Sequence, residues 1–361
     1  MKKKILLITG GTGGHVIPAE NLANYLINLN SDCTLMVDKR GHKYINNFKG
    51  KICIVDSSNL YGNIIKKFFG IFILLIGFIK SFFLILFLRP RKIISFGSYA
   101  SFFPMLSCLL LKPFFKFDIF IHEQNSILGR TNKFFIFSTK KIFLNFDIFH
   151  SINSKYKNKA FVVGSPEKNI NKFIKKREKN INDIFTIFIY GGSQGSEFLS
   201  NFSAKLISII DKEKNIEAKF IMQCPKKMMH KITNDLRDIK SKIIIKDFFY
   251  NIDEILQNTS LAISRAGAGS ITDLINYNIP SVLIPLPNAK DNHQFHNASI
   301  MAKENVSVII NQRKDEIIKA KEFIYEIYRN PYKLKMINKS FAKIKVKNSN
   351  TLIYNLMNDE N

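Results

Sequence analysis

A histidine follows a run of glycines near the start of the chain. The run Gly10-Gly11-Thr12-Gly13-Gly14-His15 comes directly after a short apolar stretch and before a helical pattern that begins near Pro18. Glycines let a backbone approach a ligand closely, and the start of a helix favours an anion. The spacing matches neither the dinucleotide fingerprint nor the Walker loop. An imidazole at this position is placed to transfer a proton, although a lone histidine is more often structural.

Further polar or glycine-rich runs follow other apolar stretches. They are Gly97-Ser98-Tyr99-Ala100-Ser101, His122-Glu123-Gln124-Asn125, Gly191-Gly192-Ser193-Gln194-Gly195-Ser196, Ser264-Arg265-Ala266-Gly267-Ala268-Gly269-Ser270 with Asp273 beyond it, and Asp291-Asn292-His293-Gln294. Four consecutive polar side chains are costly to bury unless they bind a ligand or form a tight network. Each run by itself is explained as a turn or a helix cap, but together they predict a ligand site.

Predicted strands alternate with predicted helices along the chain. The strands are expected at residues 4–9, 34–37, 93–95, 118–122, 140–144 and 161–163, and again at 184–190, 219–223, 242–245, 261–264, 281–284 and 306–310. Such alternation predicts parallel sheets with helices on both faces. A charged linker over residues 167–183 separates two halves that both open with a strand, a glycine loop and a helix. The sequence therefore predicts an α/β protein with two Rossmann-like, doubly wound domains, and ligands at the carboxyl ends of their strands in a cleft between them.

The composition describes a folded protein with an unusual charge. The chain has 361 residues, with 54 Lys and Arg against 28 Asp and Glu and a formal net charge of +26. This length suffices for two hydrophobic cores. The charge favours polyanions or anionic membranes, but the abundance of Lys, Ile, Asn and Phe is also typical of an AT-rich genome. The four cysteines lie far apart without metal-ligand or redox spacing, which indicates a reducing, cytosolic compartment.

The stretch over residues 68–88 is almost wholly apolar, and Lys80 is its only charge. Its length is sufficient to span a membrane. A span here would place the first strands and the strand at 93–95 on opposite sides of a bilayer, so they could not share a sheet. Basic residues flank the stretch at Lys66, Lys67, Arg89 and Arg91. We therefore expect a helix that dips into an anionic leaflet without crossing it, with burial or contact with a partner protein as the alternatives.

Taken together, the runs GGTGGH, HEQN with Asn132 and Lys133 beyond it, and GGSQG resemble the MurG family of peptidoglycan N-acetylglucosaminyltransferases, in glycosyltransferase family 28. The resemblance extends nearly end to end. It implies the GT-B fold, with an acceptor- and membrane-binding domain over residues 1–164, on which residues 335–361 pack back, and a UDP-N-acetylglucosamine-binding domain over residues 165–334.

The resemblance also implies a reaction. N-acetylglucosamine (GlcNAc) would pass with inversion from UDP-GlcNAc to the 4-hydroxyl of N-acetylmuramic acid in undecaprenyl-pyrophosphoryl-MurNAc-pentapeptide (lipid I). The enzyme would be peripheral, at the anionic cytoplasmic face of the cell membrane, where other cell-wall synthesis proteins are candidate partners. Neither a metal nor a cofactor is implied, and the sequence has no Asp-x-Asp motif that would hold a metal.

The resemblance assigns roles by motif position. His15 is the first candidate for the general base and Glu123 is its rival. The residues expected to contact substrate are Thr12, Gly13, Gly14, Asn125, Lys168, Ser193, Gln194, Ala268, Gly269, Ser270, Asp273, His293 and Gln294. Lys168 stands where the family commonly has arginine, Asp273 where it has glutamate, Ser98 where it has glycine and Ser165 where it has asparagine. The first two departures are expected to weaken donor binding, because lysine lacks the bidentate fork of arginine and Asp273 is one methylene shorter.

Several other functions remain as alternatives. A UDP-sugar:diacylglycerol glycosyltransferase would share the fold and the membrane surface, although HEQN and GGSQG argue against it. A UDP-GlcNAc 2-epimerase would not need the apolar stretch. A nucleic-acid-binding protein would use the positive charge, but it would not need glycine loops at so many strand ends, and no nucleic-acid module is recognised. A catalytically inactive scaffold for cell-wall enzymes is the last alternative.

Overall fold

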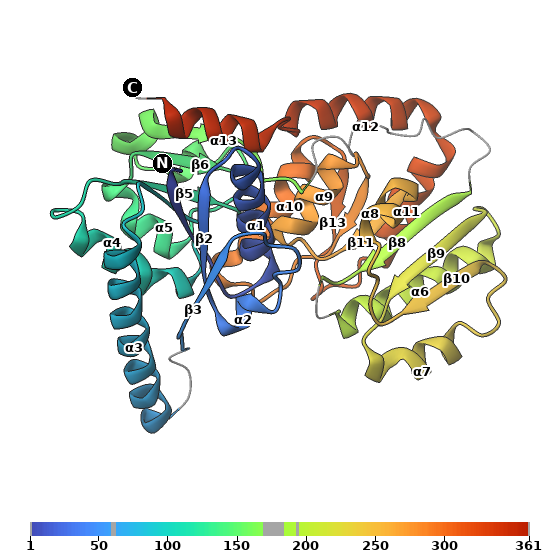
Figure 1. Ribbon diagram of the computed structural model, residues 1–361. Coiled ribbons are helices and arrows are strands. Elements are labelled where there is room, and N and C mark those ends of the chain that lie inside the picture. Colours follow the sequence, from blue (N-terminus) through green and yellow to red (C-terminus); the bar gives the residue numbers. More distant parts are fainter. Residues whose placement is uncertain (1, 59–62, 169–183, 193–194, 360–361) are drawn as a thin grey trace. The chain divides into compact units, whose positions relative to one another are not determined.

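The computed structural model describes residues 2–58, 63–168, 184–192 and 195–359, and the chain divides into two compact units. Unit 1 comprises Met1–Ile170 and Val346–Asn361, and unit 2 comprises Asn171–Lys345. Each unit is built on one parallel sheet, which confirms the predicted α/β fold class (Figure 1).

Unit 1 contains a seven-stranded sheet in the order β3-β2-β1-β4-β5-β6-β7. Its strands are β1 Lys4–Ile8, β2 Asp32–Asp38, β3 Lys51–Val55, β4 Lys92–Ser95, β5 Asp118–Glu123, β6 Lys141–Leu144 and β7 Ala160–Val162. Its helices are α1 Gly13–Asn28, α2 Lys39–His42, α3 Ile64–Leu88, α4 Phe102–Leu111, α5 Arg130–Phe135 and α13 Ser349–Asn358, with 3-10 turns η1 Tyr99–Ser101, η2 Ile136–Ser138, η3 Phe149–Ser151 and η4 Ser154–Lys159. The central strands are continuous apolar runs because helices cover both faces of the sheet.

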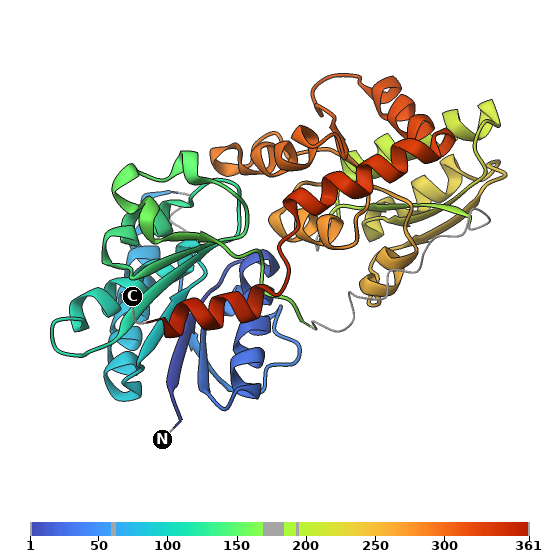
Figure 2. The same ribbon diagram turned by 90° about the horizontal axis from the view of Figure 1, so that it is seen from above.

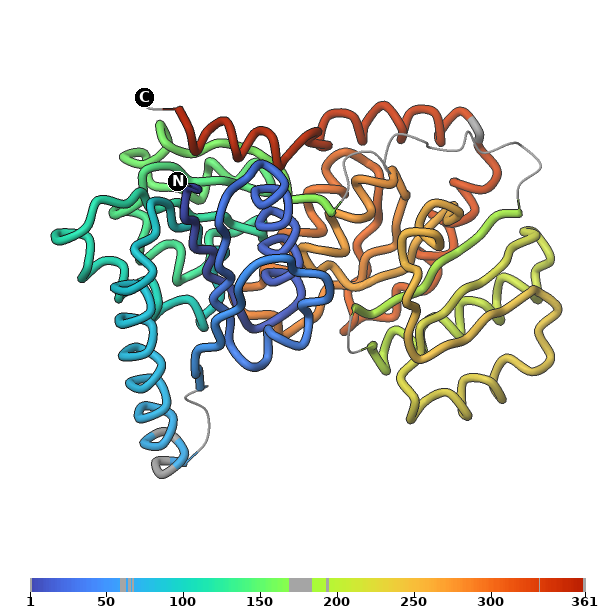
Figure 3. Tube along the Cα trace, viewed as in Figure 1, coloured from blue at the N-terminus to red at the C-terminus, as the bar shows by residue number. Residues whose placement is uncertain are grey.

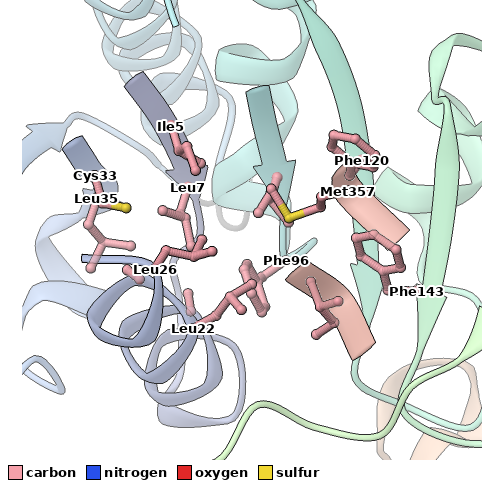
Figure 4. Packing of buried hydrophobic residues seen from close by; sticks show 14 of the residues in the cluster. Ile5, Leu7, Leu22, Leu26, Cys33, Leu35, Phe96, Phe120, Phe143 and Met357 are labelled. Carbon is pink, nitrogen blue, oxygen red and sulfur yellow. The ribbon is translucent and has the colours of Figure 1, made fainter. Parts of the chain in front are cut away.

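The core of unit 1 joins the two ends of the chain. Figure 4 shows Met357 of α13 beside Phe120 of β5 and Phe143 of β6, in one buried cluster with Leu22 and Leu26 of α1. Figure 2 shows α13 lying along the strands of this unit. Burying one such side chain fully contributes about 1.5–3 kcal/mol, so α13 is part of this domain although it follows unit 2 in sequence.

Unit 2 contains a six-stranded parallel sheet in the order β10-β9-β8-β11-β12-β13. Its strands are β8 Phe185–Tyr190, β9 Ala218–Gln223, β10 Lys242–Lys246, β11 Leu261–Ser264, β12 Ser281–Leu283 and β13 Ser307–Ile309. Its helices are α6 Glu197–Glu213, α7 Lys226–Asp235, α8 Ile252–Asn258, α9 Ala268–Asn276, α10 His293–Lys303, α11 Ile317–Arg329 and α12 Pro331–Ile344, with the 3-10 turn η5 Lys290–Asn292. In both units the first strand lies inside the sheet, so the loop that follows it reaches the switch point of the topology.

The apolar stretch forms the greater part of α3. Phe68–Leu88 is long and apolar enough to cross a membrane by length and composition, and only 22% of its most apolar window is buried. The strands on either side of it in sequence, β3 and β4, belong to one sheet. The single charge, Lys80, forms an ion pair with Asp56. In Figures 1 and 3 the N-terminal half of α3 extends away from the rest of unit 1.

Two features differ from the sequence-based expectation. The strand β3 was not predicted, although residues 52–55 form a short apolar run; it is an edge strand whose Ile52 and Ile54 are exposed. The C-terminal segment expected to belong with the first domain, residues 335–361, is divided: α12 belongs to unit 2, and the chain enters unit 1 only at Val346. Asn348, with φ 59°, is the N-cap of α13 and lies between α12 and α13.

Candidate active site

The first glycine loop connects β1 to α1 and requires glycine for steric reasons. A Cβ on Gly10 would lie 2.7 Å from the Cβ of Ala100 and 2.8 Å from Oδ1 of Asp38. Gly11 has φ +81°, and its N–H donates to Oδ1 of Asp38 at 2.8 Å. Thr12 is the N-cap of α1, and the first turn of this helix contains no acidic residue. The N–H groups of Gly13 and Gly14 therefore begin a helix that favours a bound anion.

The imidazole of His15 is held by the end of the neighbouring strand. Its Nδ1 lies 2.8 Å from the carbonyl oxygen of Phe96, directly after β4. Because a carbonyl oxygen can only accept, Nδ1 carries a proton, and Nε2 is the nitrogen that holds the lone pair when the ring is neutral. Gly97 follows with φ +75°. This turn requires glycine, because a Cβ there would lie 2.9 Å from Nδ2 of Asn132. The Phe96 carbonyl thus holds the His15 ring at the carboxyl edge of the sheet.

Two members of the HEQN run form a buried network. Nε2 of His122 donates to the carbonyl of Gly164 at 2.9 Å, and its Nδ1 accepts from the side-chain amide of Gln124 at 2.8 Å. The ring stacks on Phe96, with 5.3 Å between ring centroids. Burial lowers the pKa of His122 to about 4, so this ring stays neutral. His122 and Gln124 therefore stabilise the end of β5. Through its stacking on Phe96, His122 also stabilises the residue whose carbonyl binds His15.

Glu123 organises the loop that follows β5. One of its carboxylate oxygens accepts from the N–H of Asn125 at 3.0 Å, and the other accepts from the N–H of Gly129 and the amide of Asn132, both at 2.8 Å. The side chain is buried. Gly129 is the N-cap of α5, so the carboxylate ties the start of this helix to the strand end. The same bonds fix the backbone of Asn125, which is partly buried.

A group that sequence reasoning missed lies beside the first glycine loop. Asp38, at the end of β2, is buried and accepts from the N–H groups of Gly11 and Gly41, from the hydroxyl of Ser57 at 2.9 Å and from Nε of Arg40 at 3.1 Å. Burial alone would raise the pKa of Asp38, but the two backbone hydrogen bonds, Ser57 and Arg40 hold it below its usual value. An acidic residue at the carboxyl end of a strand next to β1 is a signal that could have found it.

The second glycine loop follows β8 in unit 2. A Cβ on Gly191 would lie 2.8 Å from the nitrogen of Ser196, which caps α6 by accepting from the N–H of Leu199. Nη2 of Arg265 donates to the Ser196 hydroxyl at 2.8 Å, and its Nη1 donates to the carbonyl of Ile284 at 3.0 Å. Arg265 thereby fastens the loop to the end of the sheet. The predicted contacts Ser193 and Gln194 lie outside the described residues.

The other predicted residues of unit 2 gather at the same edge of its sheet. Ala268, Gly269 and Ser270 form the first turn of α9, and nothing lies within 4 Å of where a Cβ on Gly269 would be. Asp273 lies in the next turn, and burial, with a smaller contribution from Asp253, raises its pKa to about 7.

The α10 residues follow the end of β12. Nδ1 of His293, the first residue of α10, lies 2.7 Å from the carbonyl oxygen of Lys290. Oε1 of Gln294 accepts from the N–H of Leu286 at 2.9 Å. Lys168 is exposed in the segment after β7 of unit 1 and is not part of this group. Among the described residues, no group of three or more His, Cys, Asp or Glu side chains could hold a metal ion.

The fold and these sites define a class of protein. Two parallel-sheet domains, each with a glycine loop after an inner strand, form the GT-B architecture of nucleotide-sugar glycosyltransferases. The chain belongs to glycosyltransferase family 28: the model of the family's N-terminal domain matches residues 5–144, and that of its C-terminal domain matches residues 186–352. The resemblance inferred from the motifs is thereby confirmed.

Curated relatives agree with this assignment over nearly the whole chain. A protein of Rickettsia bellii (strain RML369-C) is 33% identical, with 99% of both chains covered. One of Wolbachia pipientis wMel is 31% identical, with 96% of both chains covered. Both are named UDP-N-acetylglucosamine–N-acetylmuramyl-(pentapeptide) pyrophosphoryl-undecaprenol N-acetylglucosamine transferase.

Solved structures share the fold. MurG of Acinetobacter baumannii matches with a TM-score of 0.78 at 20% identity, covering 98% of this chain and 99% of that one. A UDP-N-acetylglucosamine 2-epimerase also matches, with a TM-score of 0.66 at 9% identity, covering 98% of this chain and 95% of that one. The architecture is therefore common to several activities, and the family assignment is what separates them.

Proposed function

We propose that the chain transfers GlcNAc from UDP-GlcNAc to the 4-hydroxyl of the MurNAc residue of lipid I, forming lipid II for peptidoglycan synthesis. Relatives named for this reaction match the chain from end to end. The observation that carries the proposal is the imidazole of His15, which is oriented by the Phe96 carbonyl and lies in the first turn of α1, directly after the glycine loop. A general base beside an anion-binding helix start is what a lipid diphosphate-linked sugar acceptor requires.

His15 acts as the general base in this proposal. The bond from its Nδ1–H to the carbonyl of Phe96 fixes the ring and makes Nε2 its basic nitrogen. Nε2 takes the proton of the MurNAc 4-hydroxyl while that oxygen attacks C1 of GlcNAc, and UDP departs from the opposite face, so the configuration inverts. Glu123 remains the rival base, but its carboxylate already accepts hydrogen bonds from the loop it organises.

The diphosphates of the two substrates meet different helix starts. We assign the acceptor diphosphate to Thr12, Gly13 and Gly14 at the start of α1, and the donor diphosphate to the second glycine loop with the first turn of α9. Amide N–H groups and the helix dipole stabilise the negative charge that grows on UDP as the bond breaks.

The remaining contacts of the donor follow the family pattern. Asp273 accepts from the ribose hydroxyls, His293 and Gln294 face the sugar hydroxyls, and Asn125 contacts the GlcNAc. Lys168 supplies a positive charge for phosphate without the bidentate geometry of arginine.

We infer that α3 docks unit 1 on the anionic inner leaflet. Phe68, Phe72 and Leu75 expose 72%, 58% and 51% of their surface. Both flanking strands belong to one sheet, so a peripheral insertion of the protruding half agrees with the topology better than a span. The basic residues near both helix ends then meet lipid headgroups.

Transfer of labelled GlcNAc from UDP-GlcNAc to a soluble lipid I analogue tests the function. Wild-type protein should form product, and His15→Ala should lower kcat by about a hundredfold or more, the scale of general-base catalysis. His150→Ala, at an exposed histidine in the same unit, is the matched control and should retain activity. No product with folded wild-type protein would overturn the lipid I assignment, and full activity of His15→Ala would move the base role to Glu123.

Co-sedimentation with vesicles tests the docking surface. The double substitution Phe68→Ser and Phe72→Ser removes two exposed side chains and should weaken binding to anionic vesicles by at least about tenfold, given roughly 1.5–3 kcal/mol for each buried aromatic or aliphatic side chain. Ile318→Ser, at an exposed isoleucine of unit 2, is the control. Equal binding by all three proteins would exclude α3 as the docking element.

A further inference from the structure

Arg40 lies beside the first glycine loop but has no role in the family pattern described above. It belongs to α2, immediately after β2, and β2 is the neighbour of β1 in the sheet. Its Nη2 is 4.0 Å from the position that a Cβ on Gly11 would take, and the hydroxyl of Ser98 is 3.0 Å from the same position. The guanidinium is therefore next to the backbone that the acceptor diphosphate approaches.

Two contacts fix the guanidinium in place. Its Nε donates to the buried carboxylate of Asp38 at 3.1 Å, and its carbon atom lies 5.0 Å from the ring centroid of Tyr99. Asp38 is itself held by Gly11 and Gly41, so the arginine and the loop share one anchor. Within the part of the chain that the structure describes, the pair with Asp38 uses Nε, so the Nη groups remain to bind a second anion. The side chain is 47% exposed, so a ligand can reach it.

The neighbouring cation, Lys39, has a different environment. Its ammonium pairs with Asp56 at 3.1 Å and is 78% exposed. Asp56 also pairs with Lys80 in the middle of α3, and a Cβ on Gly77 of α3 would lie 2.1 Å from the carbonyl oxygen of Asp56. Lys39 thus belongs to the anchorage of α3, whereas Arg40 belongs to the glycine loop.

The same contacts relate the arginine to α3. Ser57, which donates to Asp38, directly follows Asp56, the residue against which α3 packs. Arg40 therefore lies at the carboxyl edge of the sheet between the anchorage of α3 and the loop that ends at His15. In a lipid-linked sugar, the diphosphate joins the lipid to the sugar and has to occupy such an intermediate position.

We propose that Arg40 binds the diphosphate of the lipid-linked acceptor, together with the amide groups of the first glycine loop. The inference rests on the proposed function, because it assumes that the acceptor carries a diphosphate. A planar guanidinium can donate two parallel hydrogen bonds to phosphate oxygens, and its position is already fixed before the ligand arrives. Asp38 and Tyr99 act as positioning residues that hold the guanidinium in this orientation.

Steady-state kinetics with a short-chain lipid I analogue test the proposal. Arg40→Ala should raise the KM for the acceptor about 10- to 100-fold, the range for losing hydrogen bonds to a charged group. The KM for UDP-GlcNAc should change less than about twofold. Arg40→Lys should fall between wild type and Arg40→Ala, because it keeps the charge and loses the fork. Lys39→Ala removes the same formal charge one residue away and should leave both KM values near those of wild type.

A second acceptor separates phosphate binding from a structural effect. With an analogue linked through one phosphate, Arg40→Ala should raise the KM for the acceptor by a smaller factor. The reason is that the wild-type protein also lacks the contact between Arg40 and the missing phosphate. An equal penalty on both acceptors, or equal increases in the KM for acceptor and donor, would overturn the proposal. If wild-type protein fails to use either acceptor, the proposed function is wrong, which is a different outcome from wild-type activity that is insensitive to Arg40.

Discussion

At the residue scale, two candidate bases lie at the same sheet edge but in different environments. His15 is bonded at Nδ1 and carries its lone pair on Nε2, whereas the Glu123 carboxylate accepts three close hydrogen bonds from the loop between β5 and α5. A carboxylate with these bonds is suited to hold a loop, and an imidazole whose Nδ1 is bonded to a carbonyl has Nε2 as its basic nitrogen.

Glu123→Gln should therefore act mainly on stability. The new amide group would face N–H donors that the carboxylate accepted, so we expect a loss of about 1–3 kcal/mol in the free energy of unfolding. Urea unfolding measures the stability of Glu123→Gln, and the pH profile of kcat measures its effect on catalysis. His15→Ala is the contrasting variant and should have near wild-type stability. Unchanged stability with a hundredfold loss of kcat in Glu123→Gln would place Glu123 in the chemistry.

Asp273 predicts a pH dependence of the stability of unit 2. Its pKa of about 7 in the folded protein lies above the ordinary value of 3.8, because the partly buried carboxyl group resists ionisation. As pH rises, the unfolded chain releases this proton first, so the free energy of unfolding should fall between about pH 4 and pH 7. Above pH 7 the contribution should stay constant.

The substitution Asp273→Asn should remove that dependence. Urea unfolding followed by a probe in unit 2 at several pH values gives the slope, and Asp235→Asn, at an exposed carboxylate of α7, is the control. Equal slopes for wild type and Asp273→Asn would contradict the assignment of a raised pKa to this side chain.

At the element scale, α3 packs against α4, where the ring of Phe78 lies against Phe103 and its carbonyl accepts from Ser107, and it also makes two contacts with Asp56. Gly77 allows the helix to pass the carbonyl of Asp56, and Lys80 pairs with the side chain of the same residue. The apolar half that begins at Ile64 then extends from a fixed point, which is the arrangement that the proposed docking on a membrane requires.

Gly77→Ala should destabilise unit 1 although alanine is the better helix former. Propensity alone predicts a gain of about 1 kcal/mol, but the added Cβ would lie 2.1 Å from a backbone oxygen and force α3 to move. Gly269→Ala in α9 is the matched control, because nothing lies within 4 Å of that Cβ. Thermal unfolding compares them, and a Gly77→Ala protein as stable as wild type would show that α3 does not pack on Asp56.

At the scale of the whole molecule, the last segment of the chain belongs to unit 1. The helix α13 contributes Ile353 and Met357 to the core of unit 1, after unit 2 has been traversed. The stability of the first glycine loop and of His15 therefore depends on residues at the far end of the sequence.

Ile353→Ala should lower the free energy of unfolding of unit 1 by about 2–5 kcal/mol, since it empties a fully buried site. Leu352→Ala, one residue away and 38% exposed, should cost much less. Hydrogen exchange of the β1 and β4 amides reports on this unit separately from unit 2. Equal protection in the two variants would contradict the packing of α13 in this core.

The sequence by itself determined the alternation of strands and helices, the two glycine loops and the family. These features depend on local patterns: a buried parallel strand is a continuous apolar run, and a loop that a ligand approaches needs glycine. The same local information predicted His15 at a strand end. The strand β3 was missed although residues 52–55 are an apolar run, and the exposure of Ile52 and Ile54 follows from its place at the edge of the sheet.

Only the tertiary structure decided which polar groups meet. His122 and Gln124 turn inward to Gly164, Asp38 accepts from Gly11, and Arg40 lies beside the same loop. These contacts join residues from different strand ends, so their partners depend on the order of strands in the sheet and not on spacing along the chain. The division of the C-terminal segment between the units also depends on tertiary contacts. Ile353 is buried against a core formed by residues from the N-terminal part of the chain, which spacing along the sequence does not show.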